Sequence, residues 1–132
     1  MEEFKVRTTK KHEVVDITSL VSECVRELAD CPPEAICLVY VPHATAGVII
    51  NEHEPNIAQD FASFFEKLVP TAGTWLHNSI DDNAEAHLKS GLIGASVVLP
   101  VSEKRLILGR WQRVMLCEFD GPRERNVIVM VR

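Results

Sequence analysis

Residues 35–50 read Ala-Ile-Cys-Leu-Val-Tyr-Val-Pro-His-Ala-Thr-Ala-Gly-Val-Ile-Ile, and they set the fold class. Residues 35–41 form a continuous β-prone run that ends at a proline, and residues 47–50 form a second run. Runs without polar alternation are typical of strands that are buried on both faces. His43 and Thr45 therefore lie in a connection between two buried strands, where a polar side chain needs a specific reason.

Three helices are predicted around these strands. Thr18 can cap the first, whose apolar residues recur at helical spacing until a Pro-Pro pair ends it. Pro55 suits the first turn of the second helix, which is amphipathic. Asp82, followed three residues later by Glu85, resembles a capping box that opens a short third helix, and Gly91 closes this helix.

The remaining apolar segments predict strands near residues 4–8, 14–17, 92–101, 106–108, 111–119 and 126–131. The last four are expected to follow one another as a meander. Hairpins together with segregated helices indicate an α+β fold with mostly antiparallel strand pairing. We expect a single domain over residues 1–132.

Composition and charge exclude several classes. Hydrophobic residues make up 46% and charged residues 25% of the chain, which rules out disordered and collagen-like proteins. The net charge is −5: residues 1–98 carry 7 Lys and Arg against 15 Asp and Glu, whereas residues 99–132 carry 7 against 4. An acidic domain repels phosphate backbones, so no nucleic-acid partner is expected unless C-terminal arginines converge on one face.

The sequence also sets expectations about the compartment. The longest uncharged apolar stretch, residues 92–101, has half of the ~20 residues that a membrane span needs, so no membrane association is expected. The N-terminus lacks a basic start followed by an apolar run, and we expect a cytoplasmic protein without a signal peptide. The four cysteines form no CxxC pair and are expected to be buried, reduced thiols.

Three histidines lie at positions where packing of the hydrophobic core does not require a histidine. His43 lies between strands, His77 in the connection after the second helix, and His87 near the start of the third. Imidazole suits zinc, nickel or iron, and three such ligands with an open fourth position make a catalytic metal site. Histidines that are scattered in sequence also cap, pack or face water, so this alternative stays open.

Carboxylates lie near the same histidines. Glu52 follows Asn51 directly after a predicted strand, and Asp82 lies between His77 and His87. We expect Glu52 and Asp82 to transfer protons or to orient metal ligands. Helix capping explains Asp82 equally well, and surface exposure explains Glu52. Asn51 is expected to donate or accept a hydrogen bond from the substrate.

Two arginines near the C-terminus are candidates for phosphate binding. Arg123 and Arg125 are two residues apart, so on a strand they project the same way and can form a fork for phosphate or carboxylate. Glu118 is a carboxylate on an otherwise apolar strand face and can instead pair an arginine. Thr45 is expected to hydrogen-bond the substrate.

Five strings in this order resemble the secondary thiamine-phosphate synthase (YjbQ-like) family over nearly the whole chain. The strings are His43-Ala-Thr-Ala-Gly47, Asn51-Glu52, Asp81-Asp82-Asn83-Ala-Glu-Ala-His87-Leu-Lys, Leu108-Gly-Arg-Trp-Gln112 and Glu118-Phe-Asp-Gly-Pro-Arg123-Glu-Arg125. Two positions depart from the family pattern. Lys104 and Arg105 stand where a turn usually holds a glycine, and Arg110 replaces a small residue, so both are expected to alter the rim of the pocket.

The resemblance implies a β-sandwich with flanking helices that assembles as a homotrimer. It implies a divalent metal ion on His43, His77 and His87, and a thiamine-phosphate synthase activity that joins a pyrimidine pyrophosphate to a thiazole phosphate. Imidazole ligands favour zinc, whereas magnesium, the usual partner of pyrophosphate, prefers oxygen ligands. A metal-dependent hydrolase of a small phosphorylated or anionic metabolite is therefore an alternative, as is a non-catalytic trimer that binds a phosphometabolite.

Overall fold

The computed structural model describes residues 1–70 and 75–132. Its strands are β1 (Glu2–Arg7), β2 (Glu13–Asp16), β3 (Glu34–Tyr40), β4 (Ala46–Asn51), β5 (Ser96–Ser102), β6 (Arg105–Leu106), β7 (Arg113–Glu118) and β8 (Glu124–Val131). Its helices are α1 (Thr18–Glu27), α2 (Pro55–Leu68), the 3-10 helix η1 (Leu76–Ser79) and α3 (Ala84–Ile93). The predicted strand at residues 35–41 and the predicted helix at Pro55 are confirmed.

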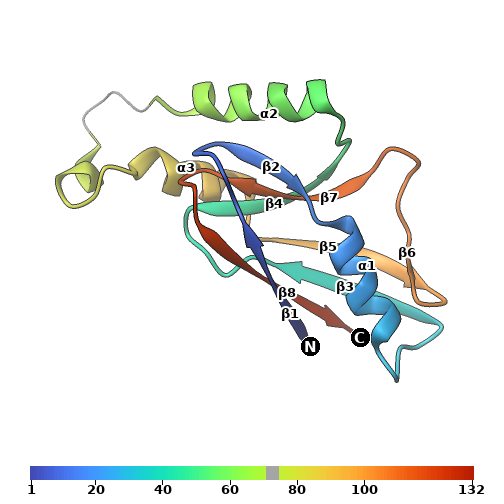
Figure 1. Ribbon diagram of the computed structural model, residues 1–132. Coiled ribbons are helices and arrows are strands. Elements are labelled where there is room, and N and C mark those ends of the chain that lie inside the picture. Colours follow the sequence, from blue (N-terminus) through green and yellow to red (C-terminus); the bar gives the residue numbers. More distant parts are fainter. Residues whose placement is uncertain (71–74) are drawn as a thin grey trace.

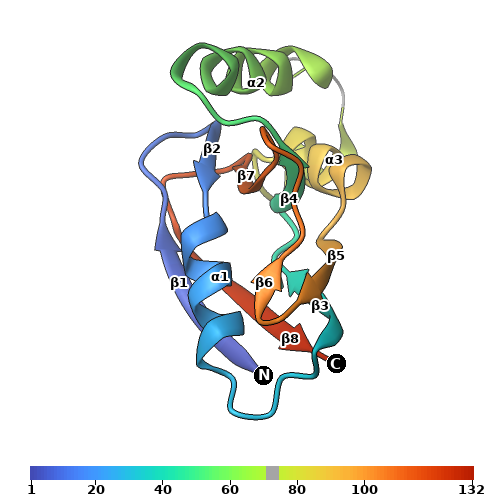
Figure 2. The same cartoon turned by 90° about the vertical axis from the view of Figure 1, so that its right-hand side faces the viewer.

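The strands form two sheets that face each other, so the predicted α+β fold with mostly antiparallel pairing is confirmed (Figure 1). The five-stranded sheet has the order β1-β8-β3-β5-β6, and the three-stranded sheet has the order β2-β7-β4. All pairings among the described residues are antiparallel. Helices α2 and α3 cover the far side of the three-stranded sheet, which makes the molecule three layers deep (Figure 2).

The predicted C-terminal meander is wrong beyond the β5–β6 hairpin. Strand β7 leaves the five-stranded sheet and pairs with β2 and β4, while β8 returns to pair with β1 and β3. The reason lies in the burial of β7, whose residues 114–118 are all buried. Such a run has no polar face that could indicate which sheet it joins.

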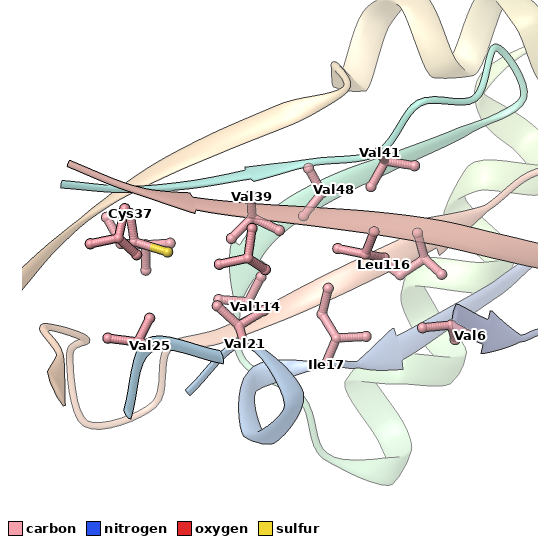
Figure 3. Close-up of a cluster of buried hydrophobic side chains, with 14 of the residues drawn as sticks. Val6, Ile17, Val21, Val25, Cys37, Val39, Val41, Val48, Val114 and Leu116 are labelled. Carbon is pink, nitrogen blue, oxygen red and sulfur yellow. The ribbon is translucent and has the colours of Figure 1, made fainter. Parts of the chain in front are cut away.

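A first core fills the space between the two sheets and α1 (Figure 3). Val39 from the five-stranded sheet, Leu116 from the three-stranded sheet and Val21 from α1 are fully buried there. Burying a side chain of this size contributes roughly 1.5–3 kcal/mol. The first core therefore joins the two sheets through apolar side chains.

A second core lies between the three-stranded sheet and the helices. Cys117 and Phe119 contact Phe65 of α2 and Ala86 of α3 in this cluster. The Phe65 and Phe119 rings meet edge to face with centroids 5.0 Å apart. Because residues alternate along a strand, Leu116 points to the first core and Cys117 to the second.

Two predicted helix starts are wrong by one position. Ile17 rather than Thr18 is the N-cap of α1, because the Thr18 hydroxyl donates to Asp16 Oδ1 over 2.7 Å. Asn83 rather than Asp82 is the N-cap of α3, so the predicted capping box of Asp82 and Glu85 does not form. The Ala84 amide instead donates to Asn78 Oδ1 over 3.1 Å.

One predicted helix end is also wrong. Helix α3 continues through Gly91 and ends at Gly94, whose φ of 98° places it in the left-handed region. Glycine adopts this conformation without the steric cost that other residues meet. Gly91 has helical geometry and therefore does not stop the helix.

We expect Phe65→Ala to lower the free energy of unfolding by about 3–5 kcal/mol, because it opens a cavity in the second core. Phe64→Ala is the matched control on the same helix, since the Phe64 side chain is 53% exposed. Its effect should stay below about 1 kcal/mol. Urea unfolding followed by circular dichroism measures both, and equal effects would contradict the assignment of the second core.

Candidate functional site

The polar residues gather at one end of the sandwich, where β4 and β8 begin and β7 ends. The loop that carries His43 leads into β4, and the Ser90 hydroxyl of α3 donates to the Ala46 carbonyl over 2.6 Å. His87 precedes Ser90 by three residues and so shares its face of α3. This face therefore packs beside the loop that carries His43 and Thr45.

A buried ion pair between Glu118 and Arg125 forms the base of this end. Arg125 Nε donates to Glu118 Oε2 over 2.8 Å, and Arg125 Nη2 donates to Oε1. The exposed fractions of their side chains are 0% for Glu118 and 4% for Arg125. The amides of Phe119 and Asp120 and the Thr8 hydroxyl also donate to the Glu118 carboxylate. The pairing of Glu118 with an arginine is thus confirmed.

Arg125 connects this ion pair to the loop before β4. Its Nη2 donates to the Thr45 carbonyl over 3.1 Å and to the Thr45 hydroxyl over 2.9 Å. The Phe119 amide also donates to the Thr45 carbonyl over 3.2 Å. The ion pair therefore fixes the backbone that presents His43.

The predicted fork of Arg123 and Arg125 does not form. Strand β8 begins at Glu124, so Arg123 lies in the preceding turn, where strand parity does not apply. Arg123 is exposed, and its Nη2 lies 3.0 Å from Asp120 Oδ2. Binding of a substrate by either arginine stays a prediction.

His43 is held by the backbone of β8. The Asn126 amide donates to His43 Nε2 over 2.8 Å, so the lone pair of this nitrogen is engaged. Burial and the nearby charge of Arg125 lower the His43 pKa, against the opposing effect of Glu118. The neutral ring then carries its proton on Nδ1, where it can donate a hydrogen bond but cannot bind a metal ion.

His77 has the opposite arrangement. Its Nε2 lies 3.0 Å from Asn83 Oδ1, while Asn83 Nδ2 donates to Asp120 Oδ2 over 3.0 Å. Because the amide nitrogen faces the carboxylate, the amide oxygen accepts from His77 Nε2. The His77 Nδ1 lone pair is thereby left for a metal ion or a proton.

His77 and His87 lie together. Their ring centroids are 4.7 Å apart with an interplanar angle of 75°. Within residues 1–70 and 75–132 of one chain, no group of three His, Cys, Asp or Glu side chains is placed to hold a metal ion. The His77–His87 pair fits two ligand positions, whereas the engaged lone pair of His43 does not fit a third, so the set of three stays a prediction.

The other predicted site residues are exposed. Asn51 and Glu52 lie at the far end of β4, about 17 Å from Ala46 at ~3.3 Å per residue. Asn51 Oδ1 accepts the Glu52 amide over 2.8 Å, which closes a local turn. Asp82 is exposed just before the N-cap of α3. One chain thus does not bring Glu52 to the histidines, and the catalytic roles of Glu52 and Asp82 stay predictions.

Two further residues orient His77, and one of them, Asp120, was not identified from sequence. Asn83 is only 7% exposed although it is polar, and Asp120 holds its amide. The predicted role of Lys104 and Arg105 at the pocket rim is not met within one chain. They lie at the opposite end of β5 from α3.

The chain matches known proteins over nearly its full length. The family model described as "UPF0047 protein YjbQ-like" matches residues 2–132. The chain belongs to this family. A UPF0047 protein of Archaeoglobus fulgidus is 46% identical over 127 residues, covering 96% of this chain and 97% of its own. The UPF0047 protein YugU of Bacillus subtilis is 38% identical over 130 residues, covering 96% and 94%.

Solved structures agree with this family assignment. A hypothetical protein from Aeropyrum pernix K1 superposes with a TM-score of 0.93 at 41% identity, covering 99% of this chain and 96% of that chain. A YjbQ/UPF0047 protein from Clostridium acetobutylicum gives a TM-score of 0.91 at 34% identity and covers all of both chains. The Clostridium acetobutylicum structure carries the family name, and both structures support the fold.

We expect Glu118→Gln to lower the free energy of unfolding by about 3–5 kcal/mol, because it leaves the Arg125 charge buried without its counter-ion. Glu124→Gln is the matched control, since the Lys5–Glu124 pair is exposed. That loss should be at most about 1 kcal/mol. Urea unfolding at neutral pH measures both variants, and comparable losses would remove the special role of the buried pair.

Proposed function

We propose that this protein is a metal-dependent enzyme that acts on a small phosphorylated or anionic molecule. The observation that carries this proposal is the contact between His77 and His87, with His77 held by Asn83 so that Nδ1 is available. Borderline metal ions such as zinc prefer imidazole nitrogen. We therefore propose His77 and His87 as zinc ligands.

The side chains around the pair have separate roles in this proposal. His77 and His87 would hold the zinc ion, which would supply a Lewis acid for a phosphoryl oxygen and a water of lowered pKa, about 7. Asn83 and Asp120 hold the His77 ring in its orientation. His43 donates from Nδ1 to an anionic group of the substrate, and the Thr45 hydroxyl, which accepts from Arg125, donates its own proton there.

The family resemblance adds thiamine-phosphate synthase activity to the proposal, with hydrolysis as the competing reaction. The synthase would release pyrophosphate and form thiamine phosphate. A hydrolase would instead release inorganic phosphate from at least one compound in a panel of phosphorylated metabolites. Glu52→Gln and Asp82→Asn test the proposed proton transfer in either assay. Stabilisation by a ligand without any product would indicate the non-catalytic binding protein instead.

Zinc binding tests the proposal directly. We expect His77→Ala and His87→Ala each to weaken zinc binding at least about tenfold, and Asn83→Ala to weaken it about 10–100-fold through loss of ring orientation. His53→Ala is the control, because His53 lies outside the pair and contacts the Val14 carbonyl at 3.3 Å. Isothermal titration and elemental analysis measure zinc, and turnover is measured on the same samples. Unchanged zinc binding in both histidine variants would overturn the proposal.

The same zinc titration tests whether His43 is the third zinc ligand, as the family resemblance implies. Binding through His43 requires loss of the hydrogen bond from the Asn126 amide to Nε2. We expect the amide signal of Asn126 to stay in place in nitrogen–proton correlation spectra, while the His77 and His87 ring signals shift. Movement of the Asn126 amide together with both rings would show that His43 joins the metal.

We further propose a homotrimer in the cytoplasm. The outer face of the five-stranded sheet is apolar and uncovered in one chain: Ile36 is 57% exposed, Val98 59% and Tyr40 40%. Continuous apolar faces of this kind mark protein interfaces. The four cysteines are free thiols, which suits a reducing compartment. Among the described residues, no helix combines the length and apolar character needed for a bilayer crossing.

We expect Val98→Asp to convert the trimer to monomers, because it places a carboxylate on the outer face of β5. Phe64→Asp is the control with a similar exposed fraction, 53%, on α2 at the other side of the molecule. Light scattering after size-exclusion chromatography measures the mass. A Val98→Asp protein that keeps the wild-type mass would show that this face does not hold the assembly.

A further inference from the structure

A second cluster of charged residues lies far from the histidines, between α1 and the β5–β6 hairpin. Helix α1 and β6 lie side by side there (Figure 2). They line a pocket of about 410 Å³. Its polar side chains are Arg26, Lys104, Arg105, Arg113, Thr18 and Ser22. The pocket lies at the start of β7, about 17 Å from Glu118 at the other end at ~3.4 Å per residue.

The positive charge of this pocket is mostly unbalanced. Arg113 Nε lies 2.8 Å from Asp16 Oδ2. In the part of the chain that the structure describes, neither Arg26, Lys104 nor Arg105 has a carboxylate within 4 Å. Four cations therefore face one carboxylate, in a protein whose net charge is −5. Such a concentration of one charge in a concave site attracts an anion.

The turn between β5 and β6 fixes the position of Lys104 at this pocket. The turn between β5 and β6 places Glu103 at φ 48° and Lys104 at φ 60°. Residues other than glycine adopt the left-handed region less readily, but a two-residue hairpin turn of this kind requires it at both positions. Lys104 occupies it, and its Nζ donates to the Leu28 carbonyl over 2.7 Å at the end of α1. The hairpin turn and the hydrogen bond to Leu28 together hold this lysine at the pocket wall.

We propose that this pocket binds the phosphoryl group of a small soluble metabolite. Guanidinium groups match phosphate oxygens in pairs, and the Thr18 and Ser22 hydroxyls add further donors. Leu106 and Leu108 complete the lining and can contact an apolar part of the same ligand. A concave pocket with an apolar wall favours a small molecule over an extended polyanion. The site is independent of the proposed zinc chemistry.

Sodium pyrophosphate is the probe. Titration followed by calorimetry and by nitrogen–proton correlation spectra should shift the amides around Arg26, Arg105 and Arg113. We expect the double variant Arg26→Glu with Arg105→Glu to weaken binding at least about tenfold, because charge-assisted hydrogen bonds are lost. The control with the same change in net charge is Arg7→Glu with Lys67→Glu, at exposed positions elsewhere. It should change affinity less than about twofold.

Lys104→Gly is a second variant that keeps the fold, because glycine adopts a φ of 60° without strain. It removes the hydrogen bond to the Leu28 carbonyl but relieves the positive φ, so the melting temperature should change little while pyrophosphate binding weakens about threefold or more. The zinc-site variant His77→Ala should bind pyrophosphate at the pocket as the wild type does, which separates this proposal from the proposed function.

Three results would overturn the inference. One is the absence of amide shifts at the pocket up to about 10 mM pyrophosphate, the weakest affinity of functional interest. Another is equal weakening by the pocket variant and its charge-matched control. The third is that anionic lipid vesicles or single-stranded DNA bind in a manner that depends on Arg26 and Arg105, while pyrophosphate causes no amide shifts at the pocket. The surface would then recognise a polyanion.

Discussion

The end of the sandwich that carries the histidines depends on one buried ion pair, Glu118 with Arg125. Each ion would cost several kcal/mol to desolvate alone, and the pair is stabilised because five hydrogen-bond donors point at the Glu118 carboxylate. Arg125 also holds both oxygens of Thr45. The pair thereby links β7, β8 and the loop before β4, and it places His43 against the Asn126 amide.

Hydrogen bonds with two asparagines then determine whether each histidine can donate a proton or bind a metal ion. The Asn126 backbone donates to His43, which turns the free nitrogen of that ring into a donor, while the Asn83 side chain accepts from His77 and leaves a lone pair. Sequence patterns identify such rings as candidates without distinguishing donor from ligand. The difference depends on which neighbour supplies a proton, and this is decided only when β8 and the N-terminus of α3 pack.

The sequence allowed the fold class to be predicted because residues 35–41 and the amphipathic helix at Pro55 carry strong local signals. The position of β7 was not predictable, since its two faces are apolar for different reasons, one toward each core. Local pattern also failed for Lys89 and Glu85, which are 0% and 1% exposed. Their burial depends on distant partners, His12 at 2.8 Å from Lys89 Nζ and Lys11 at 2.9 Å from Glu85 Oε1.

Charge balance distinguishes the two ends of β7. At the histidine end, the carboxylates of Glu118 and Asp120 each neutralise an arginine, so the protein alone offers little attraction to a phosphate there. In the proposed enzyme, an anionic substrate at that end would therefore depend on the charge of the proposed metal ion. At the other end Arg113 has its carboxylate, whereas within residues 1–70 and 75–132 the remaining cations of the pocket have none within 4 Å, so the proposed phosphate site needs no metal ion. Strand β7 thus separates two proposed anion sites: one that would need the charge of a metal ion, and one whose positive charge comes from the side chains of the chain itself.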